Sequence, residues 1–551
     1  MKKFLNLLII CAACFSSCNI EDQLDIPQQG VLAVEETYTT ADDEGVLSFI
    51  TAIYSKVFGN HLDALGWTDY GTGVYSIKTH LDNMGGDLST YWSYTETAES
   101  SQYQLMWSYY YSNIYACNLA LEYLPQNTVA SPEVIEQVIS EARAIRAIMM
   151  MYLVQLWGTP PLADHIMQGD EGNTPAAESW SFIESELSAA ALGLPSKSNV
   201  NGQNQIGGRI TKEAAYAYLG KAYLWQKKYT EAASVLYDKV ISTNLYELED
   251  NFEDLNSSAA DFGPEYLWEY EFTDDPTYAT SQNGAFVVTF NWSNASINYP
   301  DEIYSGQGWG LGAYASESFG SFMEQYSGSS VNTSGSRYKG TIATYEELLS
   351  DQDRFTYSSG SKGITSTAVV NCEGYFRVRL IPRVENVMGS GFWYYNYIHN
   401  DFCFMRYAEV LLNYAEAVAM GGTPGAISGL EALNIVRRRA GLSDASTLDM
   451  DDENYGVKAE RRAELFYEGC RFIDLVRWGE AASTLSDVGK STVTFYGYED
   501  GRNDVVQTKA DWKVQSQTTI SKGFVTNKNE LFPIPLVEIS NNLNLTQNPG
   551  W

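Results

Sequence analysis

The stretch TKEAAYAYLGKAYLWQKKYTEAASVLYDKVI, residues 211–241, contains the clearest repeat pattern of this chain. Its apolar residues recur every three or four positions, which predicts two amphipathic helices. Leu219, Gly220 and Tyr223 form an L-G-x-x-Y pattern in the first helix. Ala232 follows nine residues after Tyr223, where the second helix needs a small residue in order to approach the first. The stretch therefore predicts a tight helical hairpin.

This pattern is that of a tetratricopeptide repeat, a unit that buries its apolar face only by stacking on similar units. Helical periodicity also runs through EARAIRAIMMMYLVQLWG at 141–158 and MRYAEVLLNYAEA at 405–417. Between 250 and 400 the sequence becomes rich in Gly, Ser, Asn, Tyr and Trp. We predict a mainly α fold class: a tetratricopeptide-like helical hairpin scaffold, with repeats mainly in 41–250 and 400–480, and a loop-rich second lobe that binds the ligand between 250 and 400.

The N-terminus predicts export. Residues 1–17 contain two lysines, an apolar stretch and small residues, which is typical of a secretory signal peptide. We expect Cys18, which follows two serines, to carry a lipid, with Cys14 as the rival position and ordinary cleavage to a soluble protein as the alternative. Residues 18–40 would then form the lipid anchor and an acidic tether, and residues 41–551 a single body.

Charge and motifs exclude several classes of function. The chain has 35 Lys and Arg against 69 Asp and Glu, and a net charge of −34 repels the phosphates of a nucleic acid. Motifs of zinc hydrolases and serine hydrolases are absent, and Cys117, Cys372, Cys403 and Cys470 form no C-x-x-C pair. We predict no cofactor and no metal ligands, and we interpret the four cysteines as buried or incidental thiols. A glycosidase carboxylate pair is defined by distance in space, so a lipid-anchored glycoside hydrolase stays an alternative.

One acidic segment has calcium-loop spacing. Asp449, Asp451, Glu453 and Glu460 occupy positions 1, 3, 5 and 12, but Asn454 stands where such a loop needs glycine. We interpret the segment as the acidic N-terminus of a helix.

Several segments together resemble the RagB/SusD family of outer-membrane glycan-binding lipoproteins. The most specific are AERRAELFYEGCRFIDLVRWG at 459–479 and LFPIPLVEISNNLNLTQNPGW at 531–551. The resemblance implies a helical body with four tetratricopeptide-like units, anchored by lipid in the outer membrane and facing the cell exterior. It also implies a non-catalytic protein that captures oligosaccharide or polysaccharide and delivers it to a TonB-dependent, SusC-like transporter. A peptide- or glycopeptide-binding member of the same family is the alternative.

A glycan site needs exposed aromatic planes beside amides or carboxylates, because a pyranose ring has an apolar face and a hydroxyl rim. The chain contains 13 Trp and 39 Tyr. Those in loops with this mixture are the predicted ligand residues: Trp92, Trp292 and Trp309 as the platform, with Trp67, Asn83 and Tyr304 around it.

Other conspicuous side chains are assigned to the scaffold. Four tryptophans in strongly helical runs are expected in the core: Trp107, Trp157, Trp225 and Trp478. Four charged residues of the 459–479 segment have opposite signs at three-to-four spacing, which predicts ion pairs on the surface of a helix or partly buried: Arg461, Glu464, Glu468 and Arg471.

Overall fold

A computed structural model describes residues 33–62, 83–84, 94–200, 203–204, 207–272, 314–327, 337–344, 347, 375–379, 401–486, 492–498, 512–519 and 523–551. The predicted signal peptide, Cys18 and most of the predicted tether lie outside these residues. The described part is mainly helical, which confirms the predicted fold class. None of its helices is both long and apolar enough to span a membrane.

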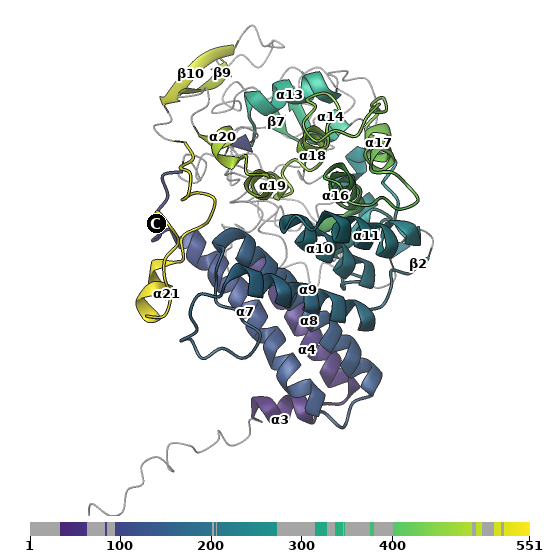
Figure 1. The fold of residues 1–551 in the computed structure, drawn as a ribbon, viewed down its shortest axis with the longest axis vertical. Coiled ribbons are helices and arrows are strands. Elements are labelled where there is room, and N and C mark those ends of the chain that lie inside the picture. Colours follow the sequence, from purple (N-terminus) through teal and green to yellow (C-terminus); the bar gives the residue numbers. More distant parts are fainter. Residues whose placement is uncertain are drawn as a thin grey trace, which may run out of the picture.

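The helices form a stack that follows chain order (Figure 1). Its members are α3 (Val34–Thr39), α4 (Asp43–Leu62), α7 (Ser101–Tyr123), α8 (Pro132–Trp157), α9 (Ala176–Gly193), α10 (Lys212–Trp225), α11 (Tyr229–Lys239), α16 (Tyr407–Ala419) and α17 (Gly429–Arg439). Each helix from α7 to α11 packs against the next, and α11 packs against α16 although the second lobe separates them in sequence. The later helices are α18 (Val457–Glu464), α19 (Cys470–Trp478), α20 (Ala481–Leu485) and α21 (Leu536–Asn541).

The hairpin of α10 and α11 confirms the prediction made for residues 211–241. The Thr211 side chain accepts a hydrogen bond from the Ala214 amide (3.2 Å) and caps α10. A Cβ placed on Gly220 would lie only 2.5 Å from Leu236 of α11. Ala232 is completely buried. Small residues on both helices therefore permit their close approach.

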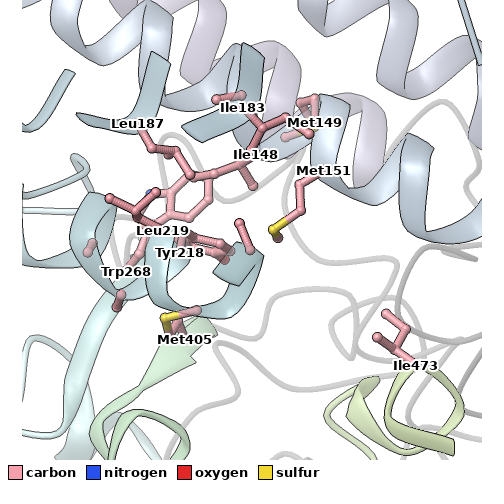
Figure 2. Packing of buried hydrophobic residues seen from close by; sticks show 14 of the residues in the cluster. Ile148, Met149, Met151, Ile183, Leu187, Tyr218, Leu219, Trp268, Met405 and Ile473 are labelled. Carbon is pink, nitrogen blue, oxygen red and sulfur yellow. The ribbon is translucent and has the colours of Figure 1, made fainter. Parts of the chain in front are cut away.

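The core is continuous through the stack (Figure 2). Ile148 of α8, Leu187 of α9 and Leu219 of α10 meet there, together with Trp268 and Met405 from two strands. The four tryptophans expected in the core all pack there, two buried and two partly buried: Trp107, Trp157, Trp225 and Trp478.

The C-terminal segment closes on the end of α8. The Trp157 indole donates a hydrogen bond to the Pro533 carbonyl (2.8 Å), and the Asn548 amide donates to the Trp157 carbonyl (2.9 Å). The Phe532 amide donates to the Leu156 carbonyl (2.7 Å). Two segments that lie far apart in sequence are thus joined by directed hydrogen bonds.

The strands form short antiparallel pairs. These are β1 (Asn83–Met84) with β5 (Tyr314–Ala315), β2 (Asn199–Val200) with β3 (Gln203–Asn204), β4 (Tyr266–Tyr270) with β8 (Phe402–Arg406), β6 (Ile342–Thr344) with β7 (Tyr375–Arg377), and β9 (Thr492–Tyr498) with β10 (Trp512–Thr519). The second lobe also contributes α13 (Glu317–Ser327) and α14 (Arg337–Thr341), and four 3₁₀ helices complete the described elements: η1 (Leu124–Gln126), η2 (Ile241–Thr243), η3 (Phe252–Asn256) and η4 (Ser258–Ala260).

Candidate functional site

In sequence, the predicted ligand residues lie in or near β1 and in the stretch before β5. Five of them lie outside the described residues: Trp67, Trp92, Trp292, Tyr304 and Trp309. Asn83 lies in β1, where its backbone is described and its side chain is not. The prediction that these residues form one platform therefore stays a prediction.

The β1–β5 pair joins the early part of the chain to the second lobe. Asn83 pairs with Ala315, and Met84 pairs with Tyr314. Because the strands are antiparallel, the chain that leaves Met84 and the chain that arrives at Tyr314 lie at the same end of the pair. Two stretches separated by more than 200 residues in sequence thus start from one point.

After β1, the early part of the chain is next described at Tyr94, which packs on the helical body. The Tyr94 ring is buried and meets Phe524 edge-on, with 5.3 Å between ring centroids. Its backbone has a φ of 58°, a conformation that side-chain-bearing residues adopt at a cost. Just beyond it, the Tyr103 hydroxyl of α7 donates a hydrogen bond to buried Glu96 (2.8 Å). The point at which the early segment enters α7 is therefore fixed by packing on the helical body.

The second lobe rests on α18 through aromatic stacking. Phe319 of α13 stacks on Phe466, with 3.9 Å between centroids and 13° between planes. Ala315 of β5 and Ala463 of α18 are completely buried in the same small cluster. The strand that pairs with the early segment is thus continuous with a helix that is packed on the body.

A buried cluster of ion pairs surrounds Glu464 on α18. Its carboxylate accepts hydrogen bonds from Arg406 (2.6 Å), from Arg337 of α14 in the second lobe (3.0 Å), and from Arg439 of α17. Burial by itself would raise the pKa of Glu464, but the charges of Arg439, Arg406 and Arg337 outweigh it and hold the pKa well below its usual range. A buried ion pair between Arg337 and Glu464 therefore joins the second lobe to the helical body.

Two further glutamates, Glu265 and Glu468, belong to the same cluster of ion pairs. Glu265, next to β4, pairs with Arg406 (2.7 Å) and with Arg439 (2.9 Å). Glu468 pairs with Arg406 (2.8 Å) and with Arg379 of the second lobe (3.1 Å). We refer below to the ion pairs formed by Glu265, Glu460, Glu464 and Glu468 as the arginine cluster.

These contacts correct one prediction from the sequence. Arg461 donates to Asp474 (2.8 Å) and to Asn413 (2.6 Å), whereas Glu464 and Glu468 pair with arginines from other elements. These three residues have the expected scaffold role, but their partners lie on other elements. A completely buried carboxylate such as that of Glu464 needs several donors around it, and one helix surface does not supply them. Arg471 instead lines a surface groove.

This groove lies between α13 and the 451–462 segment and has a volume of about 730 Å³. The Arg462 guanidinium lies 4.4 Å from the centroid of the half-buried Phe322 ring. Lys458 pairs with Asp451 and with Glu480. Such a hollow, with the aromatic rings of Phe322 and Tyr326 and charged groups around it, can hold a polar ligand. None of the predicted ligand residues lines it. Asp451, Glu453 and Asn454 of the segment with calcium-loop spacing do line it, but that spacing did not indicate a groove.

The segment with calcium-loop spacing does not gather its acids around one point. The Asp449 carboxylate accepts the amide protons of Asp451 (2.7 Å) and Asp452 (3.1 Å). Glu460 is completely buried and pairs with Arg337 and with Arg437 (3.1 Å). The segment is an acidic turn that leads into α18, as interpreted from the sequence.

The described cysteines are free thiols. Cys117 and Cys470 are buried, and Cys403 is partly buried. Burial raises the pKa of the Cys117 thiol to about 12, so this side chain is protonated and unreactive at neutral pH. Cys372 lies outside the described residues.

Comparisons with known proteins cover the whole body. The family described as "SusD family" matches residues 264–551, and the family described as "Starch-binding associating with outer membrane" matches residues 68–224. A SusD-like protein, P38, of Formosa agariphila is 22% identical over 520 residues, which cover 89% of this chain and 95% of the relative. A SusD-like protein of Bacteroides ovatus is 24% identical over 513 residues, covering 87% and 83%.

Solved structures have the same fold. A laminarin-binding SusD-like protein superposes with a TM-score of 0.67 at 22% identity, over 93% of this chain and 100% of that one. Surface glycan-binding protein A from Bacteroides fluxus gives a TM-score of 0.69 at 22% identity, over 93% and 100%. The fold expected from the resemblance is therefore confirmed.

Proposed function

The chain belongs to the SusD family, and on that premise we propose that it captures oligosaccharide or polysaccharide at the cell surface and delivers it to a SusC-like, TonB-dependent transporter. It is a SusD-like surface glycan-binding protein associated with the outer membrane, and glycan-binding proteins of this family are non-catalytic. Delivery to a transporter is the part of the proposal that rests on the family resemblance alone.

The β1–β5 pair is the observation that supports one binding surface shared by the early part of the chain and the second lobe. Trp92 follows Met84 by eight residues and precedes the buried Tyr94 by two, while Trp309 precedes Tyr314 by five. An extended chain covers at most about 3.4 Å per residue, so the Cα of Trp309 is within ~17 Å of that of Tyr314. By the same rule the Cα of Trp92 is within ~7 Å of that of Tyr94. Both tryptophans are therefore tethered close to anchored residues.

We propose that Trp92, Trp292 and Trp309 stack on the apolar faces of sugar rings, and that Trp67, Asn83 and Tyr304 contact the ligand around them. Indole rings supply apolar area, while the amide and the phenol can exchange hydrogen bonds with sugar hydroxyls. The second lobe that carries three of these residues is held on the body by Phe319 stacking and by the arginine cluster. A binding surface on a lobe that is already fixed in place loses less conformational entropy on binding a ligand than a surface that must first be ordered.

A panel of polysaccharides tests the function. The purified mature protein is incubated with each glycan, and both retention of the protein by the glycan and release of new reducing ends are measured. We expect retention by at least one glycan with no change in its chain length. Release of reducing ends that stays with the protein through repurification would support the glycoside hydrolase instead. Retention only by peptides or glycopeptides would support the alternative ligand class.

The anchor is a second part of the proposal. If Cys18 carries the lipid, residues 18–33 separate it from α3, and an extended tether of that length reaches up to about 50 Å. We expect Cys18→Ala to release the protein from the membrane fraction, with Cys14→Ala as the matched control that stays bound. Acyl label and membrane attachment that persist in Cys18→Ala would move the lipid to another residue.

A further inference from the structure

Three carboxylates meet where the chain leaves the helical body for the second lobe. Asp261 lies just before β4, Glu269 lies in β4, and Asp401 immediately precedes β8. An oxygen atom from each acid lies within 4.8 Å of one from each of the others. Glu269 and Asp401 are buried, and Asp261 is half-buried. We call these three residues the carboxylate triad.

Backbone amides hold each acid of the triad by one oxygen. The Phe262 amide donates to Oε2 of Glu269 (2.9 Å), and the Phe272 amide donates to Oδ1 of Asp401 (2.7 Å). The Asp401 amide itself donates to Oδ1 of Asp261 (2.9 Å). The carboxylates are therefore oriented by the fold, and each retains a second oxygen.

One of these second oxygens has no partner. Oδ2 of Asp401 forms no hydrogen bond, although the residue is only 5% exposed. A buried acceptor without a donor is costly, and its presence calls for a group that would satisfy it. Because the neighbours of this residue are two further carboxylates, a cation or a shared proton would satisfy the oxygen, and another acceptor would not.

The protein supplies no cation of its own here. Among the described residues, no Lys, Arg or His nitrogen lies within 4.0 Å of an oxygen of the triad. Lys197 comes near Glu269, but its ammonium group donates to the carbonyls of Gly263 (2.7 Å) and Tyr266 (3.0 Å). The buried acids Glu464 and Glu265, by contrast, each pair with at least two arginines.

We infer that Asp261, Glu269 and Asp401 bind one calcium ion. Calcium takes oxygen ligands at roughly 2.3–2.6 Å, so any two of its ligands are at most about 5.2 Å apart, and three oxygens within 4.8 Å of one another can share one ion. A site made of carboxylate oxygens alone suits a hard cation such as calcium, whereas softer metals bind more often through nitrogen and sulfur. Half-buried Asp261 leaves a route for the ion and for the water molecules that complete its coordination.

The position of the triad gives a bound ion a structural role. Phe272 and Asp401 are the residues at which segment 273–400 leaves and rejoins the described strand pair. That segment contains the second-lobe residues proposed to bind glycan, but the inference does not depend on that function. A cation shared by Asp401, Asp261 and Glu269 closes the neck of the lobe, since it links β4 to the residue that opens β8. The lobe is thereby held on the body by a ligand from solution.

Calcium titration of the full mature protein tests the inference. The protein is first freed of metal with EDTA, and binding is then measured by calorimetry, with thermal melts in EDTA and in excess Ca²⁺. We expect one equivalent of Ca²⁺ to bind, Mg²⁺ to bind at least tenfold more weakly, and Ca²⁺ to raise the melting temperature. Limited proteolysis of segment 273–400 should be slower with Ca²⁺ than with EDTA. Equal affinity for both ions would overturn the assignment to calcium.

Variants separate the triad from the other acids. Asp401→Asn and Glu269→Gln should each weaken Ca²⁺ binding at least tenfold, and two substitutions keep the test decisive if one of them fails to fold. The matched control is Asp451→Asn, in the acidic turn before α18, which should bind Ca²⁺ as the wild type does. No binding by the folded wild-type protein, or wild-type affinity in a folded Asp401→Asn protein, would overturn the inference.

Discussion

The arginine cluster and the carboxylate triad bury acids in opposite ways. Glu464 has three guanidinium groups around it, and its pKa is well below the usual range. Burial raises the pKa of Asp261 to about 7 and that of Glu269 to about 8, and no arginine offsets the effect. Charges within the chain thus join the second lobe to the body, whereas the neck of that lobe is the part that we propose to depend on protons or ions from solution.

The largest expected effect comes from breaking the arginine cluster. Glu464→Gln removes the charge that faces Arg337, Arg406 and Arg439, and truncation of one partner in a buried ion pair costs about 3–5 kcal/mol. We expect the free energy of unfolding to fall by that amount in urea titrations. The loss should be the same in EDTA and in Ca²⁺, because the triad is untouched.

The control for this variant is an exposed pair of the same chemistry. Glu431 pairs with Arg438, and both side chains are nearly half exposed. A surface pair contributes about 0–1 kcal/mol, so Glu431→Gln should unfold close to the wild type. Similar losses in both Glu→Gln variants would contradict the view that burial is what makes the arginine cluster important.

The second effect separates binding from stability. If an indole of the proposed platform loses about 80 Å² of apolar surface to a sugar face, it contributes about 2 kcal/mol at roughly 25 cal/mol per Å². Trp309→Ala should then weaken glycan binding about 20- to 30-fold in isotherms and leave the melting temperature unchanged. Trp157→Ala, in the buried core, is the opposite case, since truncation there costs about 3–5 kcal/mol of stability. Unchanged affinity in a folded Trp309→Ala protein would place the site elsewhere.

The sequence predicted those parts of the molecule that depend on local patterns. The hairpin at 211–241 could be predicted because Gly220 and Ala232 follow a repeat in which both small residues have a fixed spacing. The partner of Trp157 could not, because Pro533 is 376 residues away and its contact depends on how the tail folds back. Periodicity describes one helix at a time, so it indicated pairs along one helix, whereas the structure pairs Arg461 of α18 with Asp474 of α19, and Glu464 with arginines from other parts of the chain.

The carboxylate triad had no signal in the sequence. Asp261 and Glu269 are eight residues apart, but Asp401 joins them only through the pairing of β4 with β8. The acidic turn at 449–456 was more conspicuous in sequence, yet its acids cap backbone amides and pair with a lysine. That acidic spacing was interpreted as the start of a helix, and no spacing along the chain could indicate the triad, because its acids come together only in space.

The smallest expected effect is the dependence of stability on pH, which differs between the carboxylate triad and the arginine cluster. An acid whose pKa is raised in the folded protein stabilises it at low pH, and this contribution is lost as pH rises toward the folded pKa. For Asp261 and Glu269 the loss begins above their usual range near 4 and continues to about 7 and 8. Glu464 has a lowered pKa, so its contribution is lost only when the pH falls below about 4.5.

Between pH 5 and 7 the two groups can therefore be distinguished, because of these two groups only the triad titrates there. Burial raises the pKa of Glu249 to about 7, and the hydrogen bond to Asp164 raises that of His165, but both residues are the same in the wild type and in the variant, so their contributions cancel. In EDTA, we expect the double variant Asp261→Asn/Glu269→Gln to gain stability relative to the wild type by on the order of 1–2 kcal/mol as the pH rises from 5 to 7. One pKa unit corresponds to about 1.4 kcal/mol, and water at half-buried Asp261 lowers the effect. Lys197, whose pKa burial lowers to about 8, titrates above this window and does not disturb the comparison. In Ca²⁺ the wild type should lose this pH dependence, because the ion replaces the protons that the triad holds. A difference between wild type and variant that stays constant from pH 5 to 7 in EDTA would mean that the acids of the triad are already ionised without a metal, and that the neck of the lobe is no more sensitive to the solution than the arginine cluster.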